Sequence, residues 1–208
     1  MPNGRAGSEQ GQKDLEQPDD TAEANATLSL KLRALKKKRS LLVNYPSLQK
    51  EIRVHFVCTG NGYRSRLAEA YLKAKQIPKL HVSSSGIAAE QCYLKNGPIC
   101  WDAMRLIFKY HLIPFMSPLW TQATSQLLTQ TDIAIFMSQE HYQYAKDYLD
   151  YQDTYYQIWN IADMNGIPEW DSASLEWDIA RITAAEHTFE QIRKKVDAFV
   201  DDIKYLDI

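Results

Sequence analysis

The chain has 208 residues, of which 45% are hydrophobic, and its formal net charge at pH 7 is −2. This length fits one domain with an extension, and the apolar share is sufficient for a packed core. The near-zero charge excludes the overall basic character of a general nucleic-acid binder, so we expect no nucleic-acid partner.

The first fifty residues are expected to lie outside the folded domain. Residues 1–27 are polar and nearly free of large apolar side chains, which predicts a disordered tail without a signal peptide. Residues 28–50 predict a basic amphipathic helix and a linker. Its cationic run, Lys31 to Arg39, favours a solvated helix face, and contact with an anionic surface is the alternative.

Cysteine is sparse in this sequence, with Cys58, Cys92 and Cys100 the only three. An odd, sparse set without metal-ligand spacing argues against a disulfide framework and predicts no metal site. No apolar run approaches the length of a membrane span. We therefore expect a reduced, cytoplasmic protein.

From residue 51 onward, strand-like and helix-like segments alternate. The expected strands are 52–58 (IRVHFVC), 80–83, 133–137 (IAIFM) and 155–161 (YYQIWNI). Helices are expected from about Arg64, from Pro98, over 139–150 and towards the C-terminus, whereas 164–181 is expected to be a long apolar connection. The alternation predicts one α/β domain over 51–208, with a four-stranded parallel sheet and helices on both faces.

The most informative segment is the turn between the first strand and the first helix, CTGNGYRS. Gly60 and Gly62 allow successive backbone N–H groups to turn inward as an anion-binding nest, and the following helix N-terminus adds positive potential. Arg64 can hold two phosphate oxygens at once. The same positive field favours the thiolate form of Cys58, so one loop can bind a phosphoryl group and activate a nucleophile. A cysteine five residues before an arginine is weak evidence by spacing alone, but its strand–loop–helix context strengthens the signal.

At these residues the sequence resembles the low-molecular-weight protein tyrosine phosphatases. VHFVCTGNGYRSRLAEAYL is similar to their phosphate-loop signature, VSSSGI to their second strand, and TDIAIFM to a later buried strand. The resemblance is strong in the loop and weak after Met137. In place of a second cysteine that many members carry, this chain has Tyr63, so the protective disulfide that those members form is not expected here.

The resemblance implies roles for the matching residues. Cys58 would be the nucleophile that forms a phosphocysteine, Arg64 would bind the phosphate, and no metal or organic cofactor would be needed. The remaining expected substrate-binding residues are Thr59, Gly60, Asn61, Gly62, Tyr63 and Ser65. Within this set, Ser65 would hydrogen-bond the thiolate and Asn61 would hold the loop in shape. The implied partner is a phosphorylated protein or a small phosphorylated substrate.

Two aspartates compete for the role of general acid, because the acid motif of the family is absent as written. Asp153 lies in DTYY, which resembles that motif, and Asp163 follows the strand expected at 155–161. Catalytic sites of open α/β sheets form at the carboxyl ends of the strands. Asp163 should share that edge with Cys58, whereas Asp153 precedes its strand, so we favour Asp163.

Three functions are therefore weighed. The favoured one is a phosphomonoester hydrolase acting on phosphotyrosine or a similar phosphorylated group. The alternatives are a thiol-dependent arsenate reductase, which shares the fold, and an inactive module that binds phosphate or phosphoproteins. The helix expected at 139–150 lacks the redox cysteines of an arsenate reductase, and the intact Cys58, Arg64 and Ser65 argue against an inactive module.

Overall fold

The computed structural model describes residues 51–152, 155–164 and 174–204. The predicted tail and basic helix in residues 1–50, and Asp153, lie outside the described residues, so the predictions made for them stay predictions. Among the helices of the described part, none combines the length and apolar character that crossing a bilayer requires.

Four strands form a parallel sheet, as predicted, and their order is β2-β1-β3-β4. The strands are β1 Ile52–Cys58, β2 Leu80–Gly86, β3 Ile133–Phe136 and β4 Tyr155–Ile158. The second strand is longer than predicted and the fourth is shorter. Because β1 lies between β2 and β3, Cys58 at its carboxyl end has strand ends on both sides.

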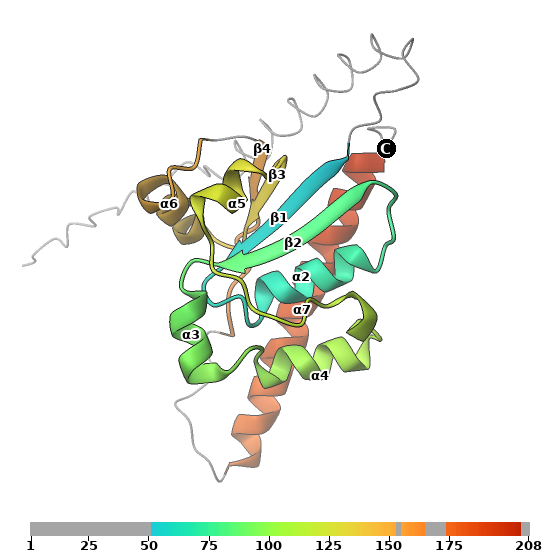
Figure 1. Cartoon of the computed structure of the whole chain (residues 1–208). Coiled ribbons are helices and arrows are strands. Elements are labelled where there is room, and N and C mark those ends of the chain that lie inside the picture. Colours follow the sequence, from blue (N-terminus) through green and yellow to red (C-terminus); the bar gives the residue numbers. More distant parts are fainter. Residues whose placement is uncertain (1–50, 153–154, 165–173, 205–208) are drawn as a thin grey trace, which may run out of the picture.

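Helices cover both faces of this sheet (Figure 1). They are α2 Arg64–Lys73, α3 Ala89–Asn96, α4 Trp101–Lys109, α5 Ser125–Thr129, α6 Gln139–Tyr148 and α7 Leu175–Lys204, with a 3-10 turn at Ile113–Phe115. The sequence analysis did not predict α3, α5 or the 3-10 turn. The expected connection over 164–181 is wrong in its last part, because α7 already begins at Leu175.

Side chains of alternating strand residues divide the core into two layers. Val54 and Phe56 of β1 pack with apolar residues of α2, α4 and α7. Val57 points to the other face and packs with Leu128 of α5 and Ala145 of α6. The burial of both faces explains the continuous apolar run in β3.

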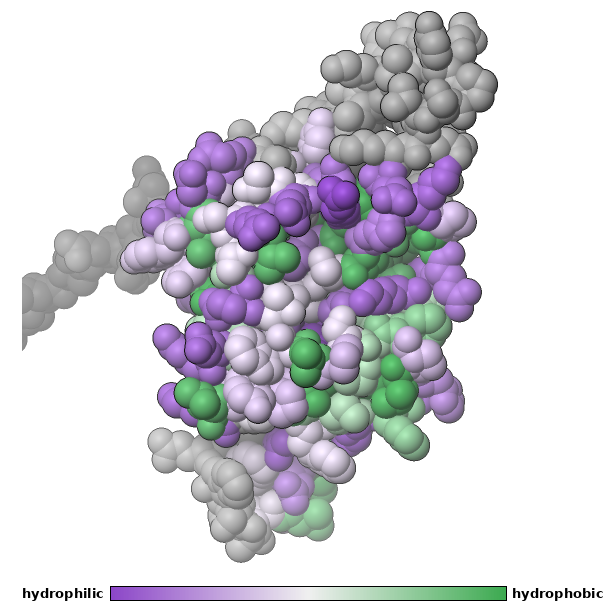
Figure 2. All heavy atoms as spheres, in the orientation of Figure 1, coloured by the Kyte–Doolittle hydropathy of each residue, from purple (hydrophilic) through white to green (hydrophobic). Residues whose placement is uncertain are grey.

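The outer surface is largely polar, with local apolar exceptions. Figure 2 shows apolar side chains gathering over α4 and the segment after it, where Phe108, Ile113 and Leu119 are exposed. The sheet edge that carries Cys58 lies away from this patch, beside α3 (Figure 1).

Candidate active site

The turn between β1 and α2 folds back on itself and packs closely against β2. Asn61 in its centre has a left-handed backbone, with φ of 51°. A Cβ on Gly86, the last residue of β2, would lie 2.5 Å from the Asn61 nitrogen, so the close approach requires glycine there. Backbone hydrogen bonds from Ile87 N to Cys58 O (2.9 Å) and from Ala88 N to Thr59 O (2.8 Å) fasten the start of the turn.

This turn borders a cavity of about 250 Å³. The predicted site residues that line it are Cys58, Thr59, Gly60, Gly62, Tyr63, Arg64 and Asp163. The side chains of Asn61 and Ser65 are fully buried beside it. The structure therefore gathers all nine predicted site residues around one cavity.

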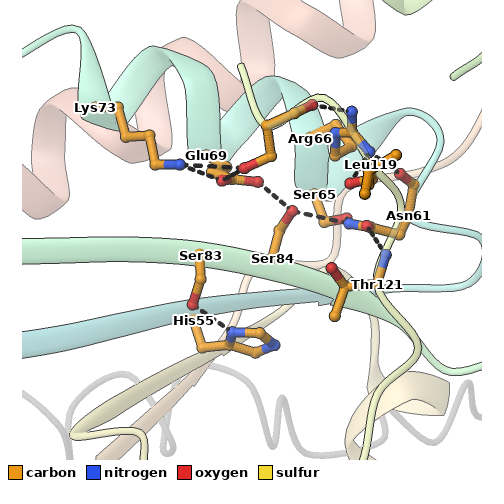
Figure 3. A network of polar contacts seen from close by, with 11 residues as sticks. His55, Asn61, Ser65, Arg66, Glu69, Lys73, Ser83, Ser84, Leu119 and Thr121 are labelled. Carbon is orange, nitrogen blue, oxygen red and sulfur yellow. Dashed lines mark hydrogen bonds and ion pairs between the residues drawn. The ribbon is translucent and has the colours of Figure 1, made fainter. Parts of the chain in front are cut away.

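A directed chain of hydrogen bonds runs from the buried Glu69 carboxylate through Ser84 and Asn61 to Ser65 (Figure 3). Ser65 in turn contacts Cys58. Ser84 Oγ donates to Glu69, because a carboxylate accepts only, and this leaves Ser84 free to accept from Asn61 Nδ2 at 2.8 Å. The same amide group donates to Ser65 Oγ at 3.0 Å.

The direction of this chain matters for the thiol. With its lone pair engaged by Asn61, Ser65 can turn its own hydrogen toward Cys58 Sγ, 2.9 Å away. Asn61 cannot flip without loss, since its Oδ1 accepts from the Thr121 backbone N–H at 2.8 Å. Ser65 Oγ can also donate to Ser85 O at 3.4 Å, but a Cys58 thiolate accepts only, so Ser65 is the donor to the ionised sulfur and stabilises it.

Arg64 lies at the rim of the cavity, with its guanidinium held in three places. Nη1 donates to Ile161 O at 3.0 Å, and Nη2 donates to Asp163 Oδ2 at 2.8 Å and to Thr59 Oγ1 at 3.3 Å. The side chain is only 7% exposed. Its charge is thus aimed at the cavity before any anion arrives.

Thr59 is positioned in turn by His141 of α6. His141 Nε2 lies 2.9 Å from Thr59 Oγ1, and its Nδ1 lies 2.9 Å from Ser138 Oγ. Burial, with the nearby Arg64 charge, lowers the pKa of His141 to about 3. The imidazole is therefore neutral and serves as a hydrogen-bonding spacer between α6 and the turn.

Asp163 lies where the sheet topology predicted it, beyond the carboxyl end of β4. Its side chain is 43% exposed, and its Oδ1 accepts from the Met164 backbone N–H at 3.0 Å. The competing Asp153 lies outside the described residues, and the chain enters β4 at Tyr155, at the opposite edge of the sheet.

The other two cysteines also line this cavity, which sequence reasoning did not foresee. Cys92 of α3 lies so close to the turn that a Cβ on Gly60 would be 2.9 Å from its sulfur. Cys100 donates its backbone N–H to Gly62 O at 3.0 Å and caps α4 by accepting from the Ala103 N–H. Burial raises the pKa of Cys100 to about 11, so this thiol stays protonated at neutral pH.

Tyr63 borders the cavity, and its hydroxyl is bound elsewhere, to α7. The hydroxyl donates to Ala185 O of α7 at 3.1 Å, and burial raises the pKa of Tyr63. Sequence reasoning missed Glu69 and Ser84 as well. The available signals were the spacing of Glu69, four residues after Ser65 on one helix face, and the serine run of β2.

Within the described ranges, no group of three His, Cys, Asp or Glu side chains is arranged to hold a metal ion. The polar groups at the cavity suit an anion instead. The loop backbone, the start of α2 and the Arg64 guanidinium all direct positive potential toward it.

Comparison with known proteins gives a family-level match. The family described as low molecular weight phosphotyrosine protein phosphatase matches residues 53–204. No curated protein matches this chain significantly.

Solved structures share the fold at low sequence identity. A low molecular weight protein tyrosine phosphatase from Streptococcus pyogenes is 20% identical, with 75% of this chain and 97% of that chain covered and a TM-score of 0.56. The Drosophila arginine phosphatase DARP is 20% identical, with 74% and 98% covered and a TM-score of 0.54. Vibrio vulnificus Wzb, solved with benzylphosphonate, is 23% identical, with 73% and 98% covered and a TM-score of 0.52.

Proposed function

This chain belongs to the low molecular weight phosphotyrosine protein phosphatase family, and we propose from its site that it hydrolyses phosphorylated side chains through a phosphocysteine on Cys58. Family membership supports a cysteine-dependent phosphatase. The observation that carries the proposal for this chain is the hydrogen bond of 2.9 Å between Cys58 and Ser65 at the floor of a cavity bordered by Arg64.

Substrate binding begins with the phosphoryl group in the loop. Its oxygens accept hydrogen bonds from backbone N–H groups of the turn and from the Arg64 guanidinium. A phosphate oxygen that accepts from Nη2 would compete with Asp163 for this donor. Binding of substrate therefore frees the Asp163 carboxyl group next to the leaving oxygen.

In the first chemical step, the Cys58 thiolate attacks phosphorus and the bond to the leaving oxygen breaks. Asp163 gives its proton to that oxygen as general acid, and the dianionic phosphate nearby favours the protonated acid before transfer. The donor groups that surround the phosphoryl oxygens stabilise charge in the transition state. The product alcohol leaves and phosphocysteine remains.

In the second step, water attacks phosphorus and Asp163 accepts its proton. The bond between phosphorus and Cys58 Sγ breaks, and Ser65 donates its hydrogen bond to the departing thiolate. Inorganic phosphate leaves and the starting state returns.

We propose phosphotyrosine, or a phosphorylated group of similar size on a protein, as the substrate. Fold neighbours named for tyrosine and for arginine phosphatases share this architecture, so both phosphorylated side chains belong in the test. Initial rates of the full chain on phosphotyrosine, phosphoarginine and phosphoserine peptides should rank phosphotyrosine first.

The matched control is Cys58→Ser, which should abolish turnover while retaining affinity for phosphate measured by calorimetry. Turnover in that variant would contradict the phosphocysteine mechanism. No turnover by the wild type, together with tight phosphopeptide binding, would indicate an inactive binding module instead.

One observation supports a second candidate, thiol-dependent arsenate reduction. Cys92 and Cys100 share the cavity with Cys58, although neither lies in the helix where the reductases carry their redox cysteines. In this reaction Cys58 would bind As(V), and a Cys92 thiolate would attack the Cys58 sulfur. Two electrons then pass to arsenic, arsenite leaves, and a Cys58–Cys92 disulfide remains.

The protonated state of Cys100 makes it a poor nucleophile, which leaves Cys92 as the second thiol. Arsenite production with dithiothreitol as reductant measures this activity. It should depend on both Cys58 and Cys92 if the candidate is right, whereas Cys92→Ser should leave phosphatase turnover measurable.

A further inference from the structure

A second arginine, Arg66, is buried beneath the loop, two residues after Arg64. It is 1% exposed and is among the largest fully buried side chains of the described chain. Arginine is rarely buried so completely unless its charge is used or paired. Figure 3 places Arg66 beside Asn61 and Leu119, on the face of β2 that also carries Ser84.

The guanidinium of Arg66 ties two distant segments together. Its Nη1 donates to Leu119 O at 2.8 Å and lies 3.5 Å from Asn61 O, and its Nη2 donates to Ser117 O. The segment 117–121 also supplies the Thr121 N–H that fixes the Asn61 amide. Arg66 therefore holds the segment that orients Asn61, and Asn61 orients Ser65 against Cys58.

The charge of Arg66 is not cancelled by a direct carboxylate partner in the described part of the chain. Its hydrogen bonds go to carbonyl oxygens, while nearby Glu69 is engaged by Lys73, Ser84 and Ser117. Burial lowers the pKa of Arg66, and the charges of Glu69 and Cys58 oppose that effect. An arginine nevertheless stays protonated in proteins.

We infer that Arg66 is a positioning residue of this site, which supports the Cys58 thiolate from beneath the loop and holds Asn61 through the 117–121 segment. The inference rests on the proposed function, because it concerns the same nucleophile. In this proposal Arg64 binds the phosphate of the substrate, whereas Arg66 holds the loop in position.

Packing alone does not account for this arginine. Its Nε is buried without a hydrogen-bond partner in the described structure, and an unpaired buried donor destabilises the fold. A buried charge is likewise weak evidence of a stabilising role.

The test measures the thiolate of Cys58 directly, without turnover. Iodoacetamide alkylates the wild type and variants across a pH series, and mass spectrometry follows the tryptic peptide 54–64, which contains Cys58 but neither other cysteine. Arg66→Met should move the pH midpoint of Cys58 alkylation upward, because a buried positive charge and the support of the Asn61–Ser65 arrangement are both lost. Arg66→Lys keeps the charge and should move the midpoint far less, yet it should weaken phosphate binding severalfold, because one ammonium cannot replace the fork.

Arg105→Met is the matched control, since Arg105 is paired with Glu186 at 2.8 Å and lines no part of the cavity. It should lower the melting temperature without moving the alkylation midpoint. If Arg66→Met does not fold, Arg66→Gln is the neutral variant to use. If neither neutral variant folds, the phosphate affinity of Arg66→Lys tests the inference.

An unmoved midpoint in a folded neutral variant, or an equal shift in Arg105→Met, would overturn the inference. So would unchanged phosphate affinity in Arg66→Lys. The proposed function fails differently, by absence of phosphatase turnover in the wild type, and that result leaves the alkylation measurement valid.

Discussion

The two sides of the cavity differ in how firmly they are held. On one side, most of the loop from Cys58 to Ser65 is buried, with Thr59 its exposed residue. β2, α6 and the 117–121 segment hold this loop through hydrogen bonds. On the other side, Asp163 is 43% exposed, and its side chain is bound to Arg64 and to the Met164 N–H.

The firmly held side is the one proposed to bind phosphate, and the exposed side is the one proposed to transfer the proton. The loop is organised before substrate arrives, so little ordering entropy opposes phosphate binding. Asp163, the proposed general acid, is instead held by Arg64, which we propose as the phosphate-binding arginine. Substrate binding and the release of Asp163 are therefore expected to be one event.

The largest expected effect comes from the residue that joins the two sides. Arg64→Lys keeps a positive charge but loses the planar fork that binds Ile161 O and Asp163, and that we expect to bind the phosphate. We expect kcat/KM to fall at least about a hundredfold, which corresponds to roughly 3 kcal/mol of transition-state stabilisation. A loss below threefold in steady-state kinetics would show that Arg64 does not contact the reacting group.

The next largest effect tests Asp163, on the exposed side of the cavity. Asp163→Asn should slow an alkyl or unactivated aryl phosphate by about a hundredfold, because their leaving oxygens need a proton. Nitrophenyl phosphate should be slowed much less, since its leaving group departs without one. Asp153→Asn is the matched control, because the chain enters β4 after it, at the far edge of the sheet. The assignment is wrong if the leaving-group-dependent defect appears in Asp153→Asn instead.

A smaller effect tests the rigidity of the loop side. A Cβ on Gly86 would lie 2.6 Å from Thr59 O and 2.7 Å from the Gly60 carbonyl carbon, and these backbone atoms cannot easily move. Gly86→Ala should lower the free energy of unfolding by about 2 kcal/mol, as overpacking does elsewhere, and should raise KM. Gly62→Ala meets its nearest atom only at 3.7 Å and should melt near the wild-type temperature. Equal melting temperatures for both variants would contradict the close packing.

The smallest effect concerns the loss of folding stability at acidic pH that the buried His55 causes. His55 of β1 lies between Ser83 and Ser85, with both ring nitrogens 2.7 Å from a serine hydroxyl. Burial lowers the pKa of His55 from 6.5 to about 4. Above pH 6.5 the imidazole is neutral in both states and has no effect. Below pH 6.5, His55 binds a proton in the unfolded state but not in the folded state. The free energy of unfolding therefore falls with pH until the pKa of the folded state is reached.

By about pH 5.5 this loss should amount to roughly 1 kcal/mol from His55 alone. Urea unfolding of His55→Gln at pH 7 and at the lower pH should show a smaller difference than the wild type shows. His81→Gln, on the exposed part of β2, is the control and should retain the wild-type difference. An unchanged difference in His55→Gln would mean that the histidine titrates freely.

The strands of the sheet were predicted from the sequence more accurately than the helices that cover it. Alternating apolar segments predicted four parallel strands, because strands buried on both faces leave a strong signal. The helix Ser125–Thr129 has only five residues, too few to show helical periodicity. The start of α7 was missed because residues such as Leu175 and Ile179 are exposed and do not mark a buried face.

The residues of the site likewise fall into those that the sequence predicted and those that it did not. The loop is continuous in sequence, so its residues could be found together, and topology alone brought Asp163 to the same edge. Glu69, Arg66 and Cys92 could not be found in this way. A charged residue on a helix usually faces solvent, and the burial of Arg66 depends on carbonyls at 117 and 119, some fifty residues away.

The length of α7 has a consequence for motion. Its 30 residues, Leu175–Lys204, make a rod of about 45 Å, longer than the sheet needs to be covered, and its first turns extend past α4 in Figure 1. Leu175 and Ile179 are exposed there, whereas Phe189, Ile192 and Val196 are buried in the core. Amide hydrogens should therefore exchange rapidly near the start of α7 and slowly in its middle, so one continuous helix spans nearly the full range of local opening free energies in this protein.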